Sequence, residues 1–178
     1  MRKFFKLAAL AAVAGALSQG AMAADGTINF TGEIVDAPCS ISPNSQNMTV
    51  PLGKVARTVL DGGKGKKATP SKFTIDLLGC GATAKGATVS FTGTPDLDDA
   101  TNLRLANAGQ VGVTTASGVA IELGDSAATK IPLGSESAQY VLGQGDNALK
   151  FQAVYVSTKD TVTVGPANSV AQFTVNYK

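Results

Sequence analysis

The sequence has no histidine and no tryptophan among its 178 residues, and it has only two cysteines. Without histidine the chain lacks the commonest general base, which argues against a hydrolase of the Ser-His or Cys-His type. Two cysteines alone cannot supply the four ligands of a Cys/His zinc site. Charged residues make up only 16% of the chain and hydrophobic residues 44%. This balance fits one globular domain with an apolar core.

Long hydrophobic runs are scarce as well, and the one that stands out lies at the N-terminus. A positively charged start precedes the small and apolar run Leu7–Leu17, and Ala21-Met22-Ala23 then has the small-x-small pattern of a signal-peptidase site. The run is shorter than the roughly 20 residues that a permanent transmembrane helix needs, and a short N-terminal anchor is the alternative. We predict an export signal over residues 1–23 and a mature chain that begins at Ala24.

Removal of this signal changes the charge balance. The complete sequence has 15 Lys and Arg against 13 Asp and Glu, whereas the predicted mature chain keeps 12 basic and 13 acidic residues, a net charge of −1. Proteins that bind nucleic acids usually present a strongly basic face to the phosphates. We therefore expect no nucleic-acid partner.

The two cysteines, Cys39 and Cys80, both lie in the predicted mature chain. Export takes a protein into an oxidising compartment, where an even pair of cysteines most simply forms one disulfide. The alternative is two free thiols with a redox role, but their 41-residue separation is not a CxxC spacing. We predict a Cys39–Cys80 disulfide.

The mature sequence has the pattern of many short β-strands. Polar and apolar residues alternate in runs separated by turns rich in Gly, Pro and Asp, and no segment keeps a helical period for more than two turns. We predict an all-β fold of two packed sheets. The expected strands cover residues 27–35, 73–77, 89–91, 119–123, 149–156 and 171–177.

Patterns that could carry chemistry are weak. The Gly- and Lys-rich stretch 62–69 lacks the spacing of a phosphate-binding loop, and the acidic stretch 96–99 lacks that of an EF-hand. Two glycosylation sequons begin at Asn29 and Asn47, but this pattern is frequent by chance. We expect a solvated, mobile basic loop and a polar turn at the first two sites, and neither an enzyme, a metal site nor a cofactor.

Both ends of the mature chain have a strand pattern with one apolar face. The front segment lies outside the predicted disulfide loop, so it is either the first strand of the sandwich or a strand donated to another molecule. The last strand has no residues beyond Lys178 to pair with it, and its apolar edge is an aggregation liability unless something covers it. The apolar positions are Gly26, Ile28, Phe30, Gly32 and Ile34 at the front, and Ala171, Phe173, Val175 and Tyr177 at the back.

Together these features resemble the structural pilins of the chaperone–usher pathway, close to type 1 and P fimbrial subunits. The resemblance covers residues 24–178. It rests on the following features: the segment Gly26–Cys39 (GTINFTGEIVDAPC), Pro51-Leu52-Gly53, the strand from Phe73 to Cys80, the run 149–155, Gly165 placed fourteenth from the C-terminus, and the penultimate Tyr177.

The resemblance implies an incomplete immunoglobulin-like sandwich that lacks its last strand and is completed by a donated one. It divides the chain into a signal peptide (1–23), a donor-strand extension (24–38) and a pilin domain (39–178). It implies three partners: a periplasmic chaperone that fills the groove first, an outer-membrane usher, and the neighbouring pilin subunit whose extension replaces the chaperone. Carried over to this sequence, the donor face is Gly26, Ile28, Phe30, Gly32 and Ile34, and the acceptor and chaperone-facing edge is Gly165, Ala171, Phe173, Val175, Tyr177 and Lys178.

The short stretch before Cys39 leaves no room for the receptor-binding domain of a tip adhesin. The resemblance therefore implies a shaft or adaptor subunit of an adhesive fimbria, exported through the periplasm to the cell surface. Two other classes remain open. A self-contained secreted sandwich that binds carbohydrate is weakened by the missing tryptophan and the three tyrosines, and a small exported enzyme is disfavoured by the missing histidine.

Overall fold

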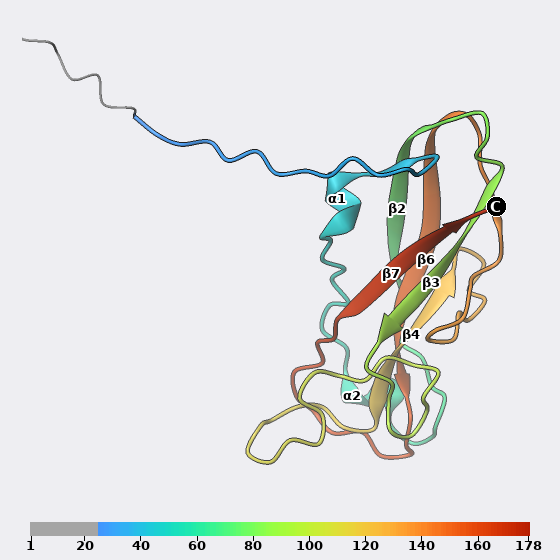
Figure 1. The fold of residues 1–178 in the computed structure, drawn as a ribbon. Helices are drawn as coiled ribbons and strands as arrows, with labels where there is room; N and C mark the ends of the chain where they lie inside the picture. The colour runs from blue at the N-terminus through green and yellow to red at the C-terminus, as the bar shows by residue number, and fades with distance from the viewer. Residues whose placement is uncertain (1–24) are drawn as a thin grey trace, which may run out of the picture. The chain divides into compact units, whose positions relative to one another are not determined.

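The structure is a computed structural model and describes residues 25–178 (Figure 1). The described part comprises an N-terminal segment that ends at Val35 and a compact unit from Asp36 to Lys178. The predicted signal peptide, residues 1–23, lies outside the described residues.

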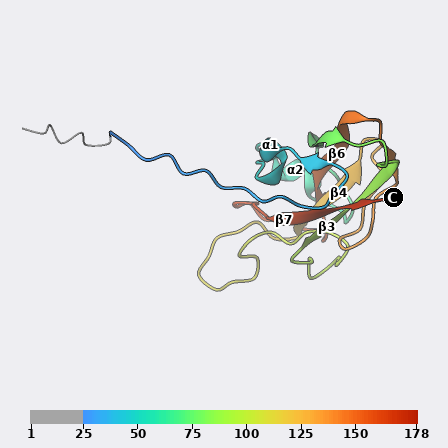
Figure 2. The same cartoon turned by 45° about the horizontal axis from the view of Figure 1, so that its top comes forward.

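Two antiparallel sheets form the compact unit. The first has the order β1-β2-β6-β4 and the second the order β5-β3-β7. In Figure 2 the layer of β3 and β7 lies below that of β4 and β6. The strands are β1 (Ser40–Ile41), β2 (Ser71–Cys80), β3 (Gly86–Gly93), β4 (Val119–Asp125), β5 (Tyr140–Val141), β6 (Gly145–Ser157) and β7 (Ala171–Tyr177). The predicted all-β sandwich is confirmed.

Two helices complete the unit, α1 (Pro43–Gln46) and α2 (Arg57–Leu60), each of four residues. One turn is too short to produce a helical period in the sequence, which explains why the sequence did not predict them. α1 packs on β2, where the buried Ser45 hydroxyl accepts a hydrogen bond of 2.9 Å from the backbone N–H of Asp76.

The core lies between the two sheets. On β6 the alternate residues Leu149, Phe151 and Ala153 are buried and belong to the core. Phe151 of the first sheet meets Phe91 of the second edge to face, with ring centroids 5.2 Å apart. Such aromatic contacts across the interface add to the burial of apolar area that holds two sheets together.

Five of the six predicted strands are present, within β2, β3, β4, β6 and β7. The sixth, over residues 27–35, is wrong for the single chain, because the structure assigns no strand to residues 26–37. A strand cannot satisfy its backbone hydrogen bonds within itself, so an extended segment becomes part of a sheet only with a partner. Here the side chains of Ile28, Phe30 and Ile34 are 78%, 90% and 100% exposed.

Candidate functional site

β7 is an edge strand. It pairs with β3 along its whole length, from Ala171 opposite Gly93 to Tyr177 opposite Ala87. The order β5-β3-β7 leaves its other edge without a neighbouring strand in the described part of the chain. The N–H and C=O groups on such an edge can pair with another chain. β7 can therefore accept one more strand.

An apolar groove of about 610 Å³ lies beside β7 and opens into the space between the sheets. Its lining combines residues 48–53, residues 167–171 with Phe173, and side chains from the core between the sheets. None of its lining residues is charged. The side chains that reach it from the core are Phe73, Phe91, Leu103, Ile121, Leu123, Ala153 and Tyr155. The groove is thus an opening into the hydrophobic interior of the sandwich.

The apolar side chains of β7 face this interior but are incompletely covered. Phe173, Val175 and Tyr177 are half-buried and pack against the core, whereas Gln172 and Thr174 are exposed. Asn176 is half-buried, and its side-chain amide bonds Glu136. The predicted alternation along the last strand is therefore confirmed. Large apolar side chains that contact a core are usually fully buried, and their partial exposure here marks the edge at which the sandwich is incomplete.

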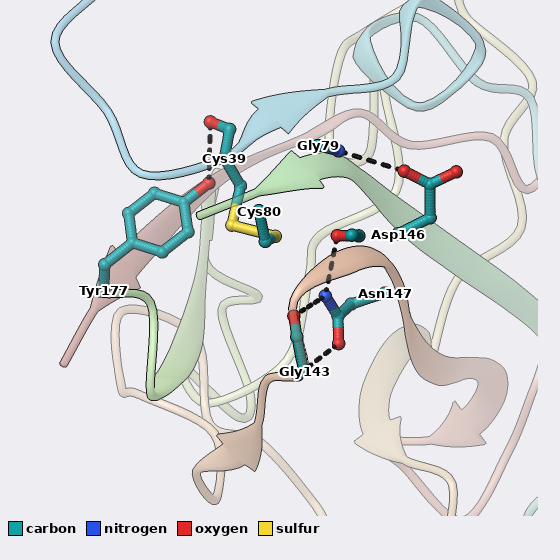
Figure 3. Close-up of a disulfide and its surroundings, with 8 residues drawn as sticks. Cys39, Gly79, Cys80, Gly143, Asp146, Asn147 and Tyr177 are labelled. Atoms are coloured by element: carbon teal, nitrogen blue, oxygen red, sulfur yellow. Dashed lines mark hydrogen bonds between the residues drawn. A yellow bond between two sulfur atoms is a disulfide. The ribbon is translucent and has the colours of Figure 1, made fainter. Parts of the chain in front are cut away.

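The C-terminal end of β7 is fixed beside the disulfide (Figure 3). Cys39 and Cys80 are bonded, which confirms the predicted pairing. The hydroxyl of Tyr177 donates a hydrogen bond of 3.3 Å to the carbonyl oxygen of Cys39, and burial raises the pKa of this tyrosine. The backbone N–H of Lys178 donates to the carbonyl oxygen of Gly86 at 2.8 Å. These contacts hold the groove's edge in place before any partner binds.

A second set of contacts holds β7 through Glu136. Its carboxylate accepts hydrogen bonds from the hydroxyl of Thr88 on β3, at 2.8 Å, and from the side-chain amide of Asn176 on β7, at 3.3 Å. The ammonium group of Lys178 lies 3.2 Å from the same carboxylate. The hydrogen bond from Thr88 and then that from Lys178 hold the pKa of Glu136 below its usual range.

Of the residues that the family resemblance placed at the acceptor edge, Ala171 and Phe173 line the groove. The others, Gly165, Val175, Tyr177 and Lys178, are not among its lining residues. Gly165 has another structural role, because a Cβ there would lie 2.6 Å from the backbone nitrogen of Ala116. Its missing side chain allows two backbone segments to pack closely, and the N–H of Ala116 donates to the carbonyl oxygen of Pro166 at 3.1 Å.

A second hollow, of about 440 Å³, adjoins the groove at the beginning of β7. Ser169 and Val170 line both hollows. Thr94 and residues 104–110 complete the second one, and Arg104 is its one charged lining residue. The sequence did not indicate residues 104–110 as part of a site. It also did not indicate that the groove-lining residues meet, because they come from distant parts of the chain.

The remaining candidates serve the fold. In the Lys-rich loop, expected to be solvated and mobile, the ammonium group of Lys67 lies 2.5 Å from the carboxylate of the buried Glu122. Asp96 caps its own turn, since its carboxylate accepts hydrogen bonds from the N–H groups of Asp98 and Asp99.

Residues 25–178 contain no group of three or more His, Cys, Asp or Glu side chains that could hold a metal ion. No helix among the same residues is long and apolar enough to span a membrane.

Comparison with known proteins identifies the family to which this fold belongs. The family model described as "Fimbrial protein" matches residues 28–178. Long polar fimbria protein A of Salmonella typhimurium is 39% identical over 175 residues, which cover 98% of this chain and 95% of that protein. The probable major fimbrial subunit LpfA of Escherichia coli O157:H7 is 38% identical over 183 residues, which cover all of both chains.

Solved structures agree with the sequence relatives. A subunit from the structure of a chaperone–usher pilus that explains rod uncoiling superposes with a TM-score of 0.72 at 27% identity, covering 87% of this chain and 96% of that one. The P pilus rod subunit PapA superposes with a TM-score of 0.65 at 26% identity, covering 80% and 100% respectively. The open sandwich described above is therefore an incomplete immunoglobulin-like fold, and the chain belongs to the fimbrial protein family as a structural subunit of a chaperone–usher fimbria.

Proposed function

We propose that this subunit polymerises by donor-strand exchange, in which residues 26–34 of one copy fill the groove beside β7 of the next. The observation that carries the proposal is the open edge of β7 over an apolar groove. The same chain carries an exposed segment with the alternating apolar residues that such a groove requires. A donated strand would complete the sheet with main-chain hydrogen bonds and fill the groove with alternate side chains.

The apolar faces of residues 26–34 and of β7 suggest the register in which the two strands pair. All strand pairs in the described residues are antiparallel, and antiparallel pairing is slightly the more stable per residue. An antiparallel donor places side chains of the same face directly opposite one another. The pairs are then Ile28 with Tyr177, Phe30 with Val175, Gly32 with Phe173, and Ile34 with Ala171.

Two of the four pairs in this register match a small residue with a large one. Gly32, which has no side chain, lies opposite the ring of Phe173, and Ile34 lies opposite the small Ala171. Ile28, Phe30 and Ile34 are exposed in the single chain, and burial of such a side chain contributes about 1.5–3 kcal/mol. Three of them, together with a ladder of backbone hydrogen bonds, can join subunits without a covalent bond.

We further propose that a periplasmic chaperone covers the groove before assembly and that an outer-membrane usher hands the subunit to the fibre. An uncovered apolar edge strand invites aggregation, so an exported subunit needs a temporary cover. The signal peptide predicted at residues 1–23 would bring the chain to the periplasm, with the cell-surface fimbria as its destination. The chain acts as a structural subunit with no enzymatic activity and no cofactor.

Substitution of leucine at two adjacent positions tests the donor strand. Gly32→Leu places a side chain against Phe173, and overpacking of this kind costs about 1–3 kcal/mol. We expect fewer and less heat-stable fibres, while the subunit still forms its disulfide and its chaperone complex. The control is Thr31→Leu, which points to the opposite face of the strand and should assemble normally. Electron microscopy and the heat stability of sheared fibres measure both.

Deletion of residues 26–34 distinguishes a donated strand from an internal strand of the subunit. We expect export, disulfide formation and chaperone binding without fibres. Normal fibres from the deletion variant would contradict donor-strand exchange. Loss of the soluble chaperone complex would instead show that the segment is an internal strand of the subunit. If the wild-type chain proved to be a stable monomer when expressed alone, a self-contained sandwich, such as a carbohydrate-binding module, would replace the proposal.

A further inference from the structure

The outward face of β7 carries side chains that the apolar groove does not use. Gln172 and Thr174 on this face are exposed, and Asn176 is half-buried. Val170 precedes the strand in the same alternating series, and its side chain is 79% exposed. A strand donated along the free edge of β7 therefore meets this outward face as well as the groove, because the side chains of paired strands lie on both faces of the sheet.

The donor segment also has a second face. Between its apolar residues stand Thr27, Asn29, Thr31 and Glu33, and Val35 follows in the same alternating series. All of these side chains are exposed in the single chain, Val35 to 60%. The series is thus polar along most of its length and ends on an uncovered valine, as the outward series of β7 begins on one.

The register proposed from the inward faces also pairs the outward faces by chemical kind. With Ile34 opposite Ala171, each outward residue of the donor lies opposite a residue like itself, and three of the four pairs are identical. The pairs are Val35 with Val170, Glu33 with Gln172, Thr31 with Thr174, and Asn29 with Asn176. The outward residues had no part in the choice of this register, so their agreement supports it independently.

We propose that the outward face of the donor strand selects the register of donor-strand exchange between two copies of this chain. The selecting contacts are Val35 with Val170 at one end and Asn29 with Asn176 at the other. This inference rests on the proposed donor-strand exchange. A donor shifted by two residues would keep its apolar face inward, but it would set Val35 opposite Gln172 in one direction or Glu33 opposite Val170 in the other. Mismatched cross-strand pairs of this kind lose the contact that matched pairs make.

Asn176 is held in position for its contact before a partner arrives. Its side-chain amide donates a hydrogen bond of 3.3 Å to the carboxylate of Glu136, which Thr88 and Lys178 also bind. The oxygen of the same amide accepts no hydrogen bond within residues 25–178. Asn29 directly opposite can donate to this oxygen, because the Cβ atoms of such a pair lie about 4.5–5.5 Å apart. A group that is already ordered loses little freedom on binding.

Val35 and Val170 meet where one subunit ends and the next begins. Both are exposed in the single chain, and directly opposite one another they would remove apolar surface from water. Only residues 36–38 separate Val35 from Cys39, which the disulfide fixes to the donor's own folded unit. The valine pair therefore also sets how closely that folded unit approaches the beginning of β7 in the acceptor.

Cysteine pairs report the register directly in fibres built from this chain alone. With Val35→Cys and Val170→Cys in every copy, oxidation should link each subunit to the next and give a ladder of multimers on a denaturing gel without reductant. Residues directly opposite in a strand pair are close enough for a disulfide. The matched control, Val35→Cys with Gln172→Cys, is two residues out of register and should give monomers. A ladder from the control alone, or from neither pair, would overturn the inference.

The rate of fibre dissociation in warm detergent measures what each contact contributes. We expect Val170→Lys and Asn29→Ala each to raise this rate about fivefold. Val141→Lys is the matched control and should dissociate at the wild-type rate, because Val141 is equally exposed but belongs to β5 at the other edge of the sheet. Adding Val35→Glu to Val170→Lys should restore a rate near that of the wild type, since opposite charges then face each other. Adding Asn176→Ala to Asn29→Ala should cause little further loss.

Wild-type rates in Val170→Lys and Asn29→Ala, or additive losses in both double variants, would overturn the inference. Its failure is distinguishable from failure of donor-strand exchange itself. In the first case the deletion of 26–34 still abolishes fibres, and in the second the deletion variant assembles.

Discussion

Tyr177, at the end of β7, makes two separate structural contacts. Its ring belongs to the inward face of β7 and packs against the core, while its hydroxyl reaches the carbonyl oxygen of Cys39. The ring thus packs on the core at the end of β7, and the hydroxyl ties the last strand to Cys39 of the disulfide. Ionisation would place a negative charge in this half-buried position next to a carbonyl oxygen, which explains why burial raises the pKa of Tyr177.

The raised pKa predicts a loss of stability at alkaline pH. A group that ionises less readily in the folded state stabilises the fold below its unfolded pKa, about 10 for tyrosine, and this contribution is lost as the pH rises through the folded value. We expect the melting temperature of the wild type to fall more steeply above about pH 10 than that of Tyr177→Phe. Thermal unfolding between neutral and alkaline pH measures the difference, and parallel curves would contradict it. The half-buried Tyr140 and the buried Tyr155 are present in both proteins.

At the scale of the element, β7 is the strand that the sequence predicted best and the one whose surroundings it predicted least. Alternation of polar and apolar residues identified 171–177 within its true bounds. The groove beside it could not be derived in this way, because Leu103, Ile121 and Tyr155 meet there only after two sheets have packed. The short strands β1 and β5 also escaped prediction, since two residues show no period.

Opposite faces of β7 should respond differently to the same substitution. Phe173→Ser with Tyr177→Ser removes two aromatic side chains from the inward face of β7, and loss of a buried aromatic costs about 3–5 kcal/mol, less here because both are half-buried. We expect little subunit to be recovered with a co-expressed chaperone. Gln172→Ser with Thr174→Ser changes the exposed face and should leave recovery unchanged. Equal recovery of the two double variants would show that the inward face of β7 is not the chaperone's binding edge.

At the scale of the whole molecule, the sequence was sufficient to predict the fold class, the disulfide and the family. The alternation of polar and apolar residues, the number of cysteines and the pattern of the two end segments are all local features of the sequence. It was insufficient where position in space decides a residue's role. Gly165, which the family resemblance assigns to the acceptor edge, also packs against the backbone of Ala116, a contact that the sequence did not indicate. Lys67, expected in a solvated loop, reaches the buried Glu122 on β4.

The disulfide should contribute measurably to the stability of the whole sandwich. It joins residues 41 apart in sequence, and the removal of a native disulfide from a small exported domain typically costs about 2–5 kcal/mol. We expect the double variant Cys39→Ser with Cys80→Ser to unfold at a lower urea concentration than the oxidised wild type. Coincident unfolding curves would refute this prediction. Reduced wild-type protein provides the matched control, and its curve should approach that of the variant.

The donor segment and β7 lie at opposite ends of one chain, and they are different surfaces. Under the proposed assembly each junction is therefore heterologous, because a residue that donates on one subunit meets a different residue on the next. In a fibre such contacts repeat by rotation and translation instead of closing into a ring, so the fibre has polarity. One terminus always presents an empty groove and the other an unused strand. Growth, capping and attachment to the cell must each act on one particular end, and a subunit that only accepts or only donates could occupy just one of them.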